Sequence, residues 1–353
     1  MKKHRKRKAL LVVAALLIIF RLFLPTLVKN YLNNVLVELP GYTGAVKEVD
    51  IALIRGAYVI KGLHLSVVDA GTEIPFINLP EADISVEWKS LFKGRIVSEI
   101  ILNKPEIIYV MEDQEETAET EEEDWTKALT DIVPLDINHF EIHDGRLSLL
   151  MVSSKPKVDL AMENLELSAD NLSNVISSER TLPSPFNMTG KTFGNSTFAI
   201  NGGINLLKEI PDMDISFELE NANVTALNDL TTYYGKVDFE SGVFNLYGEM
   251  AIADSYLKGY LKPFLKDSKL IGSEDNFLET VWEGFIGFFK FTFKNQKTDT
   301  VAMKVPFEGD LSDVETAIWP TVGSIIKNAW IEAFNNNVDN TIEFKDAFQD
   351  KEN

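Results

Sequence analysis

The chain has no cysteine and only four histidines in 353 residues. The absence of cysteine excludes a disulfide scaffold, a thiolate zinc site, an iron–sulfur cluster and a cysteine nucleophile. The sequence also lacks GxSxG, HExxH, GxGxxG and phosphate-binding glycine motifs, so nothing in it favours catalysis or a bound cofactor. We therefore predict a protein that is not an enzyme and that holds no cofactor.

Two of the histidines are only four residues apart. His139 and His143 flank Glu141 in an alternating stretch, so all three are expected on one face of a strand. Two imidazoles could share a metal ion, but no third imidazole is near and the spacing of a helical zinc motif is absent. An ordinary solvated strand face is the favoured interpretation, and no metal site is predicted.

Positive charge is scarce outside the first few residues. The chain carries 34 Lys and Arg against 54 Asp and Glu, and six of the basic residues lie within the first eight positions. Residues 9–353 therefore hold 28 basic and 54 acidic residues, a net charge of −26. A body this acidic repels phosphate backbones, so we expect no nucleic-acid partner.

The basic tail is followed by a 20-residue apolar run, Ala9–Val28. Such a run crosses a hydrocarbon core of about 30 Å, and the one charged residue in it, Arg21, has a stem long enough to snorkel. The basic tail predicts a cytoplasmic N-terminus and an external body. A cleaved signal peptide would start in the same way, but no small-x-small cleavage site follows the run. We predict a single-pass anchor whose apolar residues include Leu10, Leu11, Val12, Leu16, Leu17, Ile18, Ile19, Phe20, Phe23 and Leu24.

Beyond Gly44, apolar and polar residues alternate in short runs, which is the pattern of strands with one apolar and one wet face. Hairpin turns are expected at the pairs Asp144-Gly145, Gly202-Gly203 and Ser241-Gly242. A flexible stretch rich in Ser, Pro and Asn is expected at Ser177–Gly194. The pattern predicts a mainly β, antiparallel-rich sheet with short capping helices near both ends.

The sequence pattern divides the chain into successive segments. An acidic run with nine carboxylates and no base is expected to be a mobile loop, and an apolar stripe that includes Val322, Ile325 and Ile326 predicts a helix near the end. The segments are a cytoplasmic basic tail (1–8), the anchor (9–28), an amphipathic helix (29–40), an N-terminal β unit (41–111), the acidic loop (112–124), a β-sheet body (125–310) with a helix at about 274–287, a C-terminal amphipathic helix (311–340) and a tail (341–353).

Several stretches together resemble the AsmA-like proteins of the Gram-negative envelope, a family that includes the TamB and YhdP types. The similarity lies in the anchor followed by a strand, glycine and strand block at residues 46–110, in INHFEIHDGRLSLL (Ile137–Leu150), in DSYLKGYLKPFLKD (Asp254–Asp267) and in the ending Val305–Phe334. The resemblance implies an inner-membrane protein whose periplasmic body is an elongated, folded-over β-sheet. It also implies that this sheet forms an apolar groove, which binds or conveys phospholipid in outer-membrane biogenesis. This chain is shorter than the large members, since about 16 to 18 strands would stack to only about 80 Å.

Alternation alone does not distinguish a groove from a closed core. If the inward face is open, acyl chains could lie along it, and our candidates for the lining are Phe198, Ile200, Ile204, Leu206, Ile215, Phe217 and Leu219. If the face is closed, the same residues form the core of a sandwich, and the chain is a non-enzymatic scaffold whose acidic surface engages an envelope protein partner. Both hypotheses place the protein in the inner membrane.

Overall fold

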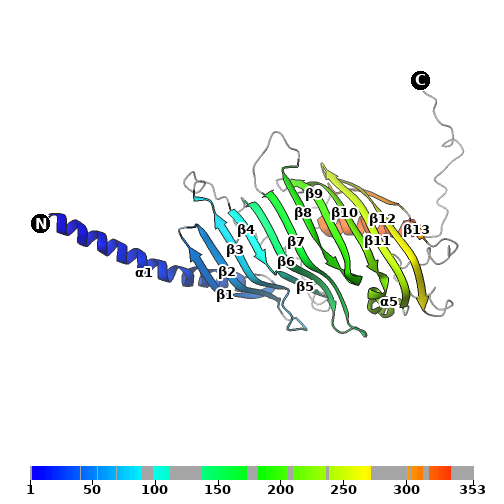
Figure 1. Ribbon diagram of the computed structural model, residues 1–353, viewed down its shortest axis with the longest axis horizontal. Coiled ribbons are helices and arrows are strands. Elements are labelled where there is room, and N and C mark those ends of the chain that lie inside the picture. Colours follow the sequence, from blue (N-terminus) through cyan, green and yellow to red (C-terminus); the bar gives the residue numbers. More distant parts are fainter. Residues whose placement is uncertain are drawn as a thin grey trace, which may run out of the picture.

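The computed structural model describes residues 2–39, 41–53, 55–68, 70–88, 98–111, 137–172, 182–205, 210–235, 238–271, 300–302, 304–312 and 318–334. Within these ranges the protein is mainly β, and its strands form one 14-stranded sheet with few helices (Figure 1). The prediction of a mainly β, antiparallel-rich chain is confirmed.

The strands follow one another across the sheet almost in chain order. They are β1 (Tyr42–Ala52), β2 (Ala57–Val67), β3 (Ile77–Val86), β4 (Ser98–Asn103), β5 (Glu106–Val110), β6 (Ile137–Met151), β7 (Val158–Leu172), β8 (Ser184–Thr192), β9 (Ser196–Asn205), β10 (Asp212–Asn223), β11 (Asp238–Ala253), β12 (Tyr256–Ile271), β13 (Thr300–Ala302) and β14 (Val305–Asp310). The helical elements are α1 (Lys2–Val37), η1 (Phe193–Asn195), η2 (Val224–Leu227), α5 (Asn228–Gly235) and α7 (Ile318–Phe334).

Nearly all neighbouring strands are antiparallel. The exceptions lie at β6, which pairs in parallel with both β4 and β5. At the far end β12 pairs with both β13 and β14. Because parallel strands cannot be joined by a tight turn, β5 and β6 do not form a hairpin.

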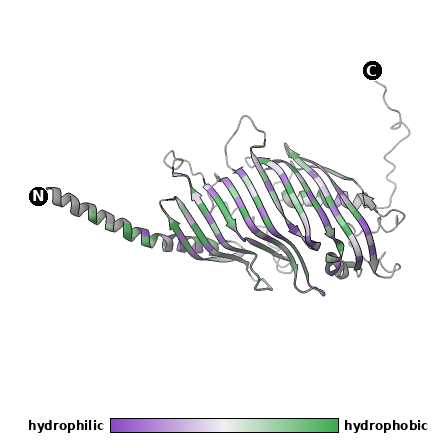
Figure 2. Ribbon diagram, viewed as in Figure 1, coloured by the Kyte–Doolittle hydropathy of each residue, from purple (hydrophilic) through white to green (hydrophobic). Residues whose placement is uncertain are grey.

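Hydrophobic and hydrophilic residues alternate along the strands (Figure 2). Bulges interrupt this alternation, and an Asn or Asp with positive φ lies at several of them: Asp144 in β6, Asn164 in β7, Asn221 in β10 and Asp267 in β12. These residue types tolerate the left-handed region, so they accommodate the extra residue that a bulge inserts. Two of them also bond to each other, since the Asn164 amide donates to the Asp144 carboxylate at 3.0 Å.

The three predicted hairpin turns were wrong, because all three pairs lie inside strands. Asp144-Gly145 lies at the bulge in β6, Gly202-Gly203 lies within β9, and Ser241-Gly242 lies within β11. Position 202 requires glycine because the backbone of β10 approaches it closely: a Cβ on residue 202 would lie 2.3 Å from the Asp214 carbonyl oxygen.

One further boundary differs from the prediction. Part of the stretch expected to be flexible, Ser177–Gly194, forms β8, whose residues pair with both β7 and β9. The segments predicted as anchor and amphipathic helix follow each other as one continuous helix, α1, which ends at Val37, near the predicted end at residue 40. The predicted acidic loop at 112–124, the helix at 274–287 and the tail at 341–353 lie outside the described residues, as does part of the C-terminal helix predicted at 311–340.

Helix α1 lies against the first strand of the sheet. Leu32 and Leu36 are buried in a cluster with Val46, Val49 and other residues of β1 to β4. The Asn33 side chain accepts a hydrogen bond from the Val46 backbone N–H at 2.6 Å. The helix thus covers an edge strand that would otherwise present unpaired backbone groups.

Candidate functional site

Six of the seven predicted lining residues lie together on one face of the sheet. Phe198 pairs with Leu219 and Ile200 pairs with Phe217 in the β9–β10 register. Ile204 pairs with Met213, and Ile215 lies opposite Gly202. Leu206 lies outside the described residues. The structure therefore brings together every predicted lining residue that it describes.

The apolar face extends far beyond these two strands. Two register rows cross twelve strands, from β1 to β14, and contain only apolar residues, Tyr and Gly. The first row is Ile51, Tyr58, Ile84, Ile100, Phe140, Ala169, Phe186, Gly202, Ile215, Met250, Gly259 and Phe307. The second row is Val49, Ile60, Ala82, Leu102, Ile142, Leu167, Met188, Ile200, Phe217, Gly248, Leu261 and Val305. With eleven spacings of about 4.8 Å, each row is about 53 Å long.

Burial varies along the rows in a regular way. At one end Val49, Ile60 and Ala82 are buried, and at the other end Leu261 and Val305 are buried. Between them the side chains are mostly half-buried, including Ile142, Leu167, Met188, Ile200 and Phe217. The middle of these two rows is therefore less covered than their ends, although Phe198 and Leu219, beside the rows on β9 and β10, are buried.

Helices cover the two ends of this face. Leu32 and Leu36 of α1 pack at the β1 end. At the other end Val322 of α7 is buried. Ile325 of α7 also packs closely on β14, because a Cβ added to Gly309 would lie 2.5 Å from the Ile325 Cδ1 atom. All described strands belong to one sheet, so within the described part of the chain no second sheet packs over the half-buried middle.

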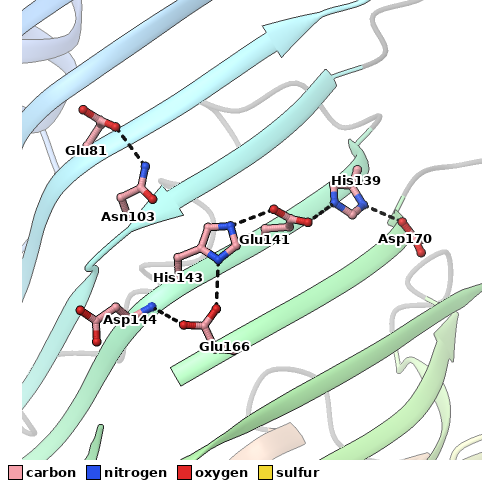
Figure 3. Close-up of polar contacts among 8 residues, drawn as sticks. All are labelled: Glu81, Asn103, His139, Glu141, His143, Asp144, Glu166 and Asp170. Atoms are coloured by element: carbon pink, nitrogen blue, oxygen red, sulfur yellow. Dashed lines mark hydrogen bonds and ion pairs between the residues drawn. The ribbon is translucent and has the colours of Figure 1, made fainter. Parts of the chain in front are cut away.

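The opposite face is polar, and a chain of polar contacts on it contains His139 and His143 (Figure 3). His139 contacts Asp170 through Nδ1 at 2.6 Å and Glu141 through Nε2 at 2.7 Å. His143 contacts Glu141 through Nε2 at 2.9 Å and Glu166 through Nδ1 at 3.0 Å. The expectation that His139, Glu141 and His143 share one strand face is confirmed, and the carboxylates of β7 complete the chain.

Both imidazoles in this chain have a carboxylate oxygen beside each ring nitrogen. Only the doubly protonated imidazolium donates from both nitrogens, so the arrangement stabilises the charged form. The pKa of His139 is raised chiefly by the bond to Asp170, and that of His143 chiefly by the bond to Glu166. The pKa of Glu141 is lowered, first by His139 and then by His143. In the described part of the chain no cluster of side chains has the arrangement of a metal site.

The polar face also has two shallow depressions. One, of about 370 Å³, is lined by residues of β7 to β10 that include Thr189, Lys191 and Glu218. The other, of about 420 Å³, is lined by residues of β9 to β12 that include Tyr247 and Tyr260. The hydroxyl of Tyr247 donates to Glu220 at 2.8 Å, and Lys304 lies 3.9 Å from the centre of the Tyr260 ring. These tyrosines already have partners within the chain, so the depressions do not compete with the apolar face as the candidate site.

The predicted anchor residues lie on α1, and most of those with described side chains are exposed. The exposed ones are Leu11, Val12, Ile18, Ile19, Phe20 and Phe23, whereas Leu24 is half-buried. The side chains of Leu10, Leu16 and Leu17 lie outside the described set. Taken over the described residues, none of the helices meets the length and hydropathy needed to cross a membrane.

Sequence reasoning missed most of the two rows. Residues such as Phe140, Ile142, Phe186 and Met188 complete the apolar face between the N-terminal strands and β9. The alternation in the sequence of β6 is a signal that could have identified Phe140 and Ile142. Phe186 and Met188 also alternate with polar residues, but the alternation is short, and the Ser, Pro and Asn residues around them favour a flexible stretch.

Comparison with known proteins adds no family to this description. No protein-family model matches the chain, and no curated protein matches it.

Proposed function

We propose that this protein is anchored in the inner membrane and holds or conveys phospholipid by its acyl chains along the apolar face of its periplasmic sheet. The observation that carries the proposal is the pair of unbroken apolar rows, whose middle is half-buried. A face of this kind is costly in water unless something apolar covers it. The resemblance to AsmA-like envelope proteins agrees with this function and with a role in outer-membrane biogenesis.

The energetics are adequate for reversible binding. Each methylene that leaves water contributes about 0.8 kcal/mol, so burying about ten methylenes contributes roughly 8 kcal/mol before the costs of association. A gross gain of that size, reduced by ordering costs, corresponds to an affinity weaker than about 1 μM. Binding of this strength would let a lipid be held and released without a nucleotide-binding site, for which the sequence has no motif.

Neighbouring residues on opposite faces provide a matched test. A photoreactive benzophenone amino acid is placed at Ile200 or Met188 on the apolar face, or at Asn201 or Asn187 on the polar face, of the full chain in a Gram-negative host. After irradiation, the purified protein is examined by mass spectrometry for phospholipid adducts. We expect adducts at Ile200 and Met188 and few at the two asparagines.

The same experiment separates the alternative function. Absence of lipid adducts at Ile200 and Met188 would contradict the proposal. Protein adducts at Asn201 or Asn187, without lipid adducts on the other face, would favour an envelope scaffold that binds a protein partner through its polar surface.

A further inference from the structure

The end of the sheet at which β1 turns into β2 lies beside the proposed anchor. The Arg21 guanidinium of α1 donates to the Ile51 carbonyl near the end of β1, and Asn33 binds Val46 nearer its start. Twelve helix residues rise about 18 Å, and five strand residues extend about 17 Å, so the two contacts agree in spacing. The helix therefore runs antiparallel to β1 and leaves the sheet at the Ile51 end.

The surface at this end contains a cluster of apolar and aromatic residues. Leu53, in the β1–β2 turn, and Trp88, just beyond β3, are each 40% exposed. The Trp88 indole lies against the turn, because a Cβ on Gly56 would be 2.7 Å from Trp88 Nε1. The Val86 N–H also donates to the Gly56 carbonyl at 2.7 Å, which ties the end of β3 to the turn. We call Leu53, Arg55 and Trp88 the sheet-end surface.

The charges at this end have partners. Arg55 forms an ion pair with Asp83 of β3 and keeps most of its side chain exposed. Arg21, the one charged residue in the predicted membrane run, is bonded to the Ile51 carbonyl. A guanidinium with a backbone or carboxylate partner can lie near the level of lipid headgroups at less cost than an isolated one.

The position of Arg21 in the apolar run sets the depth of this surface. If Ala9–Val28 spans the bilayer, Arg21 is seven residues before the outer end of the span, or about 10 Å along the helix. This distance is measured from the outer boundary of the hydrocarbon core, so Arg21 at this depth would lie below the headgroup layer. A sheet bonded to the helix at Arg21 must therefore meet the membrane, and its nearest turn lies at the headgroup layer when the Arg21 side chain reaches up to that level.

We propose that the sheet-end surface is a second membrane contact, which inserts into the headgroup layer beside the anchor. Its composition fits this environment, since Trp is enriched at membrane interfaces and Arg can bind lipid phosphate. This inference rests on the anchor in the proposed function. Its consequence is directional, because Ile51 and Tyr58, the first two members of an apolar row, then lie next to the bilayer from which a lipid would come.

The cysteine-free chain allows a clean test, because an introduced cysteine is the only thiol. Leu53→Cys is labelled with an environment-sensitive fluorophore in the full chain and reconstituted in phosphatidylcholine–phosphatidylglycerol nanodiscs. Val68→Cys is the matched control, since Val68 is also 40% exposed but lies at the far end of β2, about 36 Å away. Ile19→Cys reports on the anchor itself. Fluorescence is measured with nitroxide lipids that carry the quencher at the headgroup or along the acyl chain.

We expect the headgroup quencher to reduce the emission of the Leu53 probe by at least half and to leave that of the Val68 probe nearly unchanged. We expect the acyl-chain quencher to reduce the emission of the Ile19 probe. A second label at Trp88→Cys should behave like the one at Leu53. If Ile19 is quenched but Leu53 behaves like Val68, the sheet-end contact is wrong and the anchor stands. If Ile19 is not quenched, the anchor fails, and this inference fails with it.

Discussion

Replacing Ile200 with glutamate distinguishes an apolar face that is open from one that is a closed core. The Ile200 side chain is half-buried in the middle of a row. Ile252, on the same face near the end that α7 covers, is only 1% exposed. The same substitution at these two positions therefore compares the middle of the face with a region that is fully packed.

The expected costs differ because water can reach only one of the two sites. Fully burying an isoleucine contributes about 1.5–3 kcal/mol, and an unpaired buried charge costs several kcal/mol more. Ile252→Glu should then lower the free energy of unfolding by more than about 5 kcal/mol, enough to unfold a protein of ordinary stability. At Ile200 part of the burial is lost and the carboxylate can face water, so we expect a loss of about 1–2 kcal/mol.

The free energy of unfolding is measured by urea denaturation of the full chain in detergent, with circular dichroism as the readout of unfolding. Asn201→Glu, the neighbouring residue on the polar face, is the control and should change stability by less than about 0.5 kcal/mol. If Ile200→Glu were as destabilising as Ile252→Glu, the middle of the face would be a closed core, and the basis of the lipid proposal would be lost.

Three other substitutions have defined outcomes. The pKa values of His139 and His143 are raised by folding, so the stability that these residues contribute is present below the ordinary histidine pKa of 6.5 and is lost as pH rises through the raised values. Glu141→Gln should weaken this pH dependence, which thermal melts between pH 5 and 9 would show. At pH 6 the substitution should cost about 1 kcal/mol of stability. Gly202→Ala should destabilise by about 1–3 kcal/mol in urea denaturation, because the new Cβ would meet the Asp214 carbonyl; an unchanged midpoint would mean that β9 and β10 can separate locally. Asn33→Ala removes the bond to Val46 and should cost about 1 kcal/mol, with faster amide exchange along β1 as the specific sign that the helix has loosened from the edge.

The faces of individual strands were predictable, because alternation with a period of two states directly which side chains share a side. Phe198, Ile200, Phe217 and Leu219 are assigned to one face in this way, and the register places them in contact pairs. Nothing in a single strand says which residue of the next strand lies beside it. The continuity of the rows across twelve strands therefore became visible only with the register.

Glycine was the main source of error. Gly202-Gly203 and Ser241-Gly242 look like hairpin turns because a short loop and a close strand contact both require glycine. At Gly202 the cause is the neighbouring strand, and at Gly242 it is a φ of 146° within β11. The more reliable signal was an Asn or Asp inside an alternating run, such as Asn164 or Asp267, which marks a bulge.

The bulges govern how the chain could change in evolution. Between β6 and β7, the extra residue at Asp144 on one strand is followed by an extra residue at Asn164 on the other, so the two insertions restore each other's register. An added residue that is not taken up in a bulge would exchange the inner and outer sets of side chains for the remainder of the strand. At Asn164 the bulge takes up the extra residue, so Leu165 and Met162, three residues apart, both face the apolar side. Insertions and deletions in these strands should therefore survive at bulges, where an Asn or Asp accepts positive φ, so that the two faces are conserved although the sequence is free to drift.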